Sequence, residues 1–104
     1  MPWGDWVNEL PTEFFLAVHL AAFALGASFA WTAFRRNLDL LGWAFSLFAA
    51  AEVTYMTYHL DWTVFLFAHT VSEVLDLTAF GLVFVAAVLQ PAARRRPSVE
   101  GSAA

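Results

Sequence analysis

Three ionisable residues interrupt an otherwise apolar stretch, residues 63–84, of this 104-residue chain. His69, Glu73 and Asp76 are spaced i, i+4 and i+7, so a helix would carry all three on one face. A charged side chain at the centre of a membrane helix costs about 2.5–3.5 kcal/mol. We therefore expect these three side chains to face protein rather than lipid.

Two further apolar segments carry polar side chains that would share a helix face. In residues 39–59, Glu52, Tyr55 and His59 follow one another at i, i+3 and i+7. The first segment carries His19, and small residues that favour close helix packing lie near the same face, namely Ala22, Gly26 and Ala30.

The depth of these residues can be derived from the helical rise of about 1.5 Å per residue. On that rise His19, Glu52 and His69 lie about 9–10 Å below the same membrane surface. Three helices would then bring two histidines and a carboxylate to one level.

Imidazole and carboxylate groups at one level are suitable ligands for zinc, iron, manganese or copper. We predict a metal site built from His19, Glu52, His69 and Glu73. Neighbouring side chains would orient these ligands or relay protons, and they are Tyr55, His59, Ser72 and Asp76. A haem with His19 and His69 as axial ligands is a weaker interpretation, because three short helices leave little room for a porphyrin.

The same polar residues also form a ladder that descends from the outer surface toward the middle of the membrane. Chains of Asp, Glu and His inside membranes often carry protons. The ladder stops halfway, since the segments "GASFAWTAF" and "FGLVFVAAVL" that follow are apolar. The sequence therefore predicts a site open to one side rather than a continuous channel.

A different class of function remains open. The chain would then be an accessory or assembly subunit, or a sensor-like unit, of a larger membrane complex. Its polar cluster would then be structural: its hydrogen bonds would fix the helix register, and each would contribute about 1–2 kcal/mol. Enzymatic activity is the less favoured reading, because Ser, His and acidic residues do not occur at a spacing typical of a catalytic triad.

The elements that must position these residues follow from composition. The chain is 61% hydrophobic and only 13% charged, whereas a soluble domain is about a quarter charged. Three apolar segments are long enough to cross a bilayer, at residues 13–34, 39–59 and 62–90. Short connections between them predict an all-α integral membrane protein, an up-down-up antiparallel bundle of three transmembrane helices. Asp61 is expected to cap the third helix.

The arginines predict the orientation of these helices. The chain has no Lys, and its five Arg fall in two groups, Arg35 and Arg36, then Arg94, Arg95 and Arg96. With three spans both groups lie on one side, and the positive-inside rule makes that side cytoplasmic. The N-terminus is then outside, and we expect a prokaryotic plasma membrane protein. Residues 1–12 are expected at the outer interface, and residues 91–104 as a disordered cytoplasmic tail.

Several classes of site and partner are excluded or favoured by the residue types. The chain has no Cys, which excludes disulfides and thiolate metal ligands. It shows no phosphate-binding glycine loop and no basic-aromatic patch, so nucleotides and nucleic acids are not expected as partners. The lipid bilayer is the expected partner, together with a homo-oligomer or a larger membrane complex, because three helices are few for a buried polar site.

Overall fold

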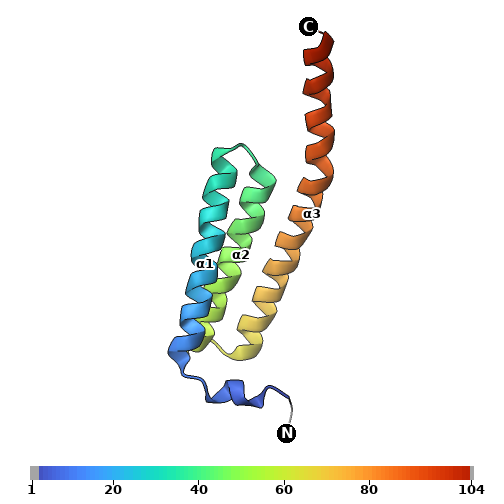
Figure 1. The fold of residues 1–104 in the computed structure, drawn as a ribbon. Coiled ribbons are helices and arrows are strands. Elements are labelled where there is room, and N and C mark those ends of the chain that lie inside the picture. The colour runs from blue at the N-terminus through green and yellow to red at the C-terminus, as the bar shows by residue number, and fades with distance from the viewer. Residues whose placement is uncertain (1–2, 104) are drawn as a thin grey trace.

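The computed structural model describes the backbone of residues 3–103 and the side chains of residues 3–89. A short 3-10 helix, η1 (Asp5–Glu9), precedes α1 (Thr12–Arg35), α2 (Asp39–His59) and α3 (Phe65–Ala103). Throughout this described part the chain forms helices and turns and no strand, which confirms the all-helical prediction (Figure 1). Three segments are long and apolar enough to cross a membrane, Thr12–Arg35, Asp39–His59 and Phe65–Leu89. These are properties of a membrane protein.

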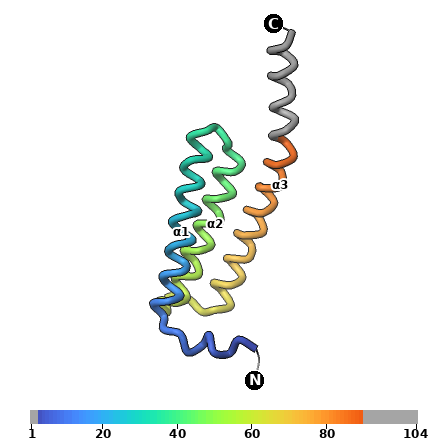
Figure 2. Tube along the Cα trace, viewed as in Figure 1, coloured from blue at the N-terminus to red at the C-terminus, as the bar shows by residue number. Residues whose placement is uncertain are grey.

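The three long helices form one open layer with α2 in the middle. Consecutive helices run in opposite directions (Figure 1). α1 packs on α2 and α2 packs on α3, whereas α1 and α3 make no close approach over the described residues. α3 also leans away from α2 as it leaves the α2–α3 turn (Figure 2). A residue on α3 therefore reaches α2 but not α1.

The two turns that separate the helices use residues that tolerate a left-handed backbone. Asn37 has φ 61° after α1, and Asp61 has φ 63° after α2. Asn and Asp adopt this conformation more readily than other residues with a side chain. The Oγ1 atoms of Thr57 and Thr63 lie 3.0 Å apart across the second turn. α3 begins at Phe65, so Asp61 belongs to the turn and does not cap the helix as expected.

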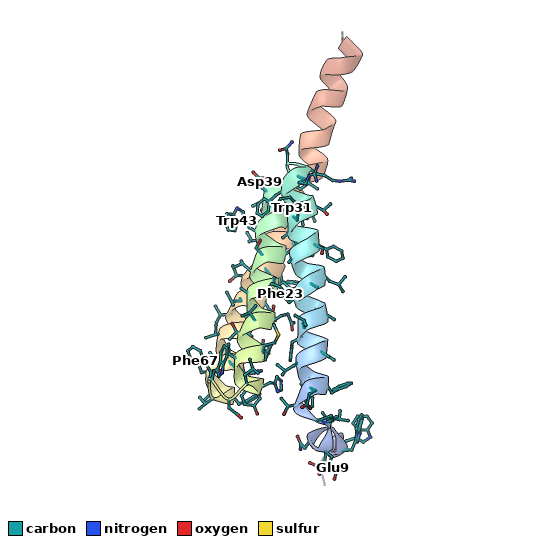
Figure 3. The ribbon with its side chains drawn as sticks, turned by 90° about the vertical axis from the view of Figure 1, so that its left-hand side faces the viewer. Glu9, Phe23, Trp31, Asp39, Trp43 and Phe67 are labelled. Carbon is teal, nitrogen blue, oxygen red and sulfur yellow. The ribbon has the colours of Figure 1, made fainter. Side chains whose placement is uncertain are left out.

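Small residues mediate the contacts between helices. The buried residues of α1 and α2 are Gly26, Ala30, Ala33, Gly42, Ala44, Ala49 and Ala51. A Cβ on Gly26 would lie 2.8 Å from the Phe48 ring, so a larger residue there would have to displace that ring at the α1–α2 contact. Ala22 is half-buried. Large side chains such as Trp43 and Phe67 point outward (Figure 3). This is the inverse of a soluble core and suits helices surrounded by lipid.

The arginine groups and the terminal segments are only partly described. Arg35 is the last residue of α1, and Arg36 follows it at the C-terminal cap. Arg94, Arg95, Arg96 and the tail expected at residues 91–104 lie outside the residues whose side chains are described. At the other end, η1 falls within the predicted interfacial segment, and Trp6 within η1 and Trp3 before it are both exposed.

Candidate functional site

A direct contact between an imidazole and a carboxylate joins α1 to α2. Nδ1 of His19 lies 2.5 Å from Oε2 of Glu52, and the two side chains are only 19% and 12% exposed. His19 and Gly26 are seven residues apart on one face of α1. The close approach at Gly26 therefore also brings His19 to α2. When Glu52 is ionised it only accepts hydrogen bonds, so Nδ1–H would donate to it, and in the neutral ring Nε2 would keep the free lone pair.

A stack of rings extends from this pair to the helix ends near the α2–α3 turn. The His19 ring stacks on the Tyr55 ring, with ring centres 5.1 Å apart. It also stacks on the His59 ring, with ring centres 5.3 Å apart. His59 in turn lies nearly parallel to Phe15, with centres 5.1 Å apart. The predicted polar face of α2 therefore meets His19. Phe15 was not predicted as part of the site, although its position four residues before His19 puts it on the same face of α1.

His69 and Glu73 lie elsewhere. Both side chains are exposed on α3, where the His69 ring lies against Phe65 with centres 5.3 Å apart. Because α3 does not approach α1, His69 does not join His19 within one chain. Among the described residues no three His, Asp or Glu side chains come close enough together to hold a metal ion. One chain brings together only His19 and Glu52 of the four predicted ligands.

The remaining two predicted residues face α2 from α3. Ser72 is fully buried, and its hydroxyl donates a hydrogen bond of 3.1 Å to the carbonyl oxygen of Ala51. This bond attaches α3 to α2, and it occupies the Ser72 proton. Asp76 is half-buried, and its Oδ1 atom is buried without a hydrogen-bond partner among the residues described.

The geometry at His19 has a definite chemical capacity. A carboxylate that holds one imidazole nitrogen fixes the orientation and tautomer of the ring, and it leaves the other nitrogen free to take a proton or a metal. Between His19 and Arg35, the polar side chains of α1 are the hydroxyls of Ser28 and Thr32.

No protein-family model matches the chain, and neither the characterised proteins nor the solved structures searched contain a significant match to it.

Proposed function

We propose that this is an integral membrane protein that takes up and releases protons at His19. The observation that supports this most directly is the 2.5 Å contact between His19 Nδ1 and Glu52 Oε2 inside the α1–α2 interface. Histidine is the side chain whose ordinary pKa allows a charge change near neutral pH, and the contact with Glu52 fixes the orientation of the His19 ring. His59 and Tyr55 connect the pair to the end of the helices that carries the N-terminus.

The proposal includes the orientation of the protein. The Arg35–Arg36 end of α1 lies in the cytoplasm and the α2–α3 turn lies outside, in keeping with the positive-inside rule. The membrane would be a prokaryotic plasma membrane. Protons would then exchange with the outer solution only, since the half of α1 that follows His19 is apolar. Transport across the whole membrane would need a partner protein.

The test is to observe the proton on His19 directly. The chain has only three histidines, so ¹⁵N-histidine labelling in nanodiscs gives a small set of imidazole signals. The His19→Ala variant assigns the signal of the half-buried His19 ring, and the exposed His69 is the internal control. We expect the His19 signal to follow the external pH reversibly, and to do so differently in the Glu52→Gln variant. A His19 signal that stays constant while that of His69 titrates would show that the pair is only structural.

A second function is favoured by a separate observation, the exposure of His69 and Glu73 within a span of α3. Ionisable side chains in lipid are costly, so another protein surface is expected to cover them. The chain would then be a subunit of a homo-oligomer or of a larger membrane complex. Two copies that join these faces would supply two histidines and two carboxylates, which is a suitable ligand set for a transition metal such as zinc.

A further inference from the structure

A groove separates α2 from α3 on the cytoplasmic side of the Ser72 contact in the proposed orientation. It has a volume of about 270 Å³, and its wall includes three aromatic rings, Phe45, Phe48 and Phe80. The small residues Ala44 and Ala79 leave the space open, and Asp76 lines the groove from α3. The backbone of α3 diverges from that of α2 as α3 leaves the α2–α3 turn (Figure 2).

Asp76 supplies an unusual group to this apolar groove. It lies close to the middle of the membrane-crossing segment Phe65–Leu89. Its Oδ1 atom is buried and, within the described part of the chain, has no hydrogen-bond partner. A buried acceptor without a donor costs free energy, and a buried carboxylate without a counter-charge costs more. Among the described residues, Oδ1 of Asp76 therefore lacks a hydrogen-bond donor or a positive charge beside it.

The chain's own composition does not offer that charge at this depth. It contains no Lys, and its Arg residues occur only at positions 35–36 and 94–96, away from the middle of α3. Glu73 lies one helical turn before Asp76 on α3, so a second acidic side chain lies near the groove. Negative groups of this kind raise the local concentration of cations.

The aromatic rings that line the groove indicate which class of cation fits beside Asp76. A metal ion requires several oxygen or nitrogen ligands, and no such group of His, Asp or Glu is assembled among the residues that the structure describes. An organic ammonium group is instead attracted to the faces of aromatic rings, and its hydrocarbon part is stabilised by an apolar wall. We propose that the groove binds a small hydrophobic amine in its protonated form, with its N–H group donating to Oδ1 of Asp76.

Size supports a small ligand. Pockets for drug-sized molecules are typically about 300–1,000 Å³, and this groove lies just below that range. The proposal does not depend on the His19–Glu52 pair, because the groove is formed by α2 and α3 alone.

The experiment compares two probes of the same shape, protonated N,N-dimethylbenzylamine and the neutral hydrocarbon isobutylbenzene. Binding is measured by calorimetry on protein in nanodiscs. We expect the amine to bind to the native chain, and its affinity to fall at least about tenfold in Asp76→Asn, since the charged hydrogen bond is lost. The matched control is Glu9→Gln, which removes an acid from η1 and should leave the affinity unchanged.

A second variant keeps the test valid where Asp76→Asn does not fold. Phe80 is 76% exposed, so Phe80→Leu leaves the helix packing intact while removing one aromatic face. We expect the amine to bind about three-fold more weakly and the hydrocarbon to bind as before. Equal binding of both probes, or an amine affinity unchanged in Asp76→Asn, would overturn the proposal. An Asp76→Asn variant that changes from dimer to monomer and keeps its amine affinity would assign the groove to a second copy instead.

Discussion

The ring of Phe34 lies so close to Gly42 that a Cβ on Gly42 would be 2.6 Å from Cε1 of the ring. The same ring meets Trp43 edge-on, with centres 5.6 Å apart. In Gly42→Ala the added methyl group must displace Phe34 and open the α1–α2 hairpin at this end. We expect a loss of stability of about 1–3 kcal/mol, measured by denaturant titration in detergent.

Gly81 provides the matched control for this change. It lies within the span of α3, and a Cβ there would have no atom within 4 Å. Alanine favours a helix by up to about 1 kcal/mol over glycine, so Gly81→Ala should be neutral or stabilising. Equal losses in Gly42→Ala and Gly81→Ala would contradict the close packing of Phe34 on α2.

Most of the fold could be predicted from apolar length and from the turns. The predicted spans 13–34 and 39–59 compare with helices at Thr12–Arg35 and Asp39–His59, because Pro11 and the Asn37 turn fix these ends. The third span was predicted to begin at Trp62, and α3 begins at Phe65. The predicted start was early because Asp61 and Thr63, which resemble helix-capping residues, instead build the α2–α3 turn.

Of the candidate site, the sequence could predict the contact between His19 and Glu52 but not the arrangement of all three helices. Depth along the helices correctly brought His19 to the level of Glu52, because α1 and α2 are neighbours joined by a short turn. The same depth argument brought His69 to that level but could not show which helices touch. A sequence does not distinguish a closed three-helix bundle from an open layer, and in the open layer α1 and α3 stay apart. The groove at Asp76 also depends on the tilt of α3, for which the sequence gives no signal.

Ser72 should stabilise the protein by about the contribution of one hydrogen bond between helices. Its hydroxyl is fully buried and donates to Ala51 across the α2–α3 interface. Ser72→Ala leaves that carbonyl without this donor, and hydrogen bonds between membrane helices contribute about 0.6 kcal/mol on average and up to about 1.7. We expect a loss in that range in the same titration. Ser28→Ala is the control, because Ser28 is exposed and bonds only to Ala24 of its own helix; an equal loss there would refute a special role for Ser72.

The His19–Glu52 pair predicts a coupling between two substitutions. His19→Ala and Glu52→Gln each leave one partner in the α1–α2 interface without the other, so each should destabilise the protein. The double variant loses the same contact only once, so the summed single effects should exceed the double effect by about 1–2 kcal/mol. Tyr55→Phe with Glu52→Gln provides a comparison pair with no direct hydrogen bond. Strict additivity for His19 and Glu52 would mean that the two side chains do not interact in the membrane.

Zinc should bind only where two copies meet. A single chain offers His69 and Glu73 on the exposed face of α3, and two ligands are too few for a stable tetrahedral site. We expect elemental analysis of dimeric protein in nanodiscs to give one zinc ion per two chains, and none after His69→Ala. His59→Ala removes a histidine from the α1–α2 side and should leave the zinc content unchanged. One zinc ion per chain in monomeric protein would contradict this arrangement.

The orientation that the arginines predict can be tested by chemical labelling. The chain has no Cys, so a single cysteine can be placed at either end of α2, as Asp39→Cys or Trp62→Cys. Asp39 and Glu9 lie near opposite ends of the α1–α2 hairpin (Figure 3), and both test positions, Asp39 and Trp62, are exposed. A maleimide that cannot cross membranes should label Trp62→Cys in intact cells and Asp39→Cys only in opened cells. Replacing Arg35 and Arg36 by Glu should produce mixed labelling, because the positive-inside rule would then no longer favour that end of α1 as the cytoplasmic one. The opposite labelling pattern would reverse the orientation and move the His19 site to the inner leaflet.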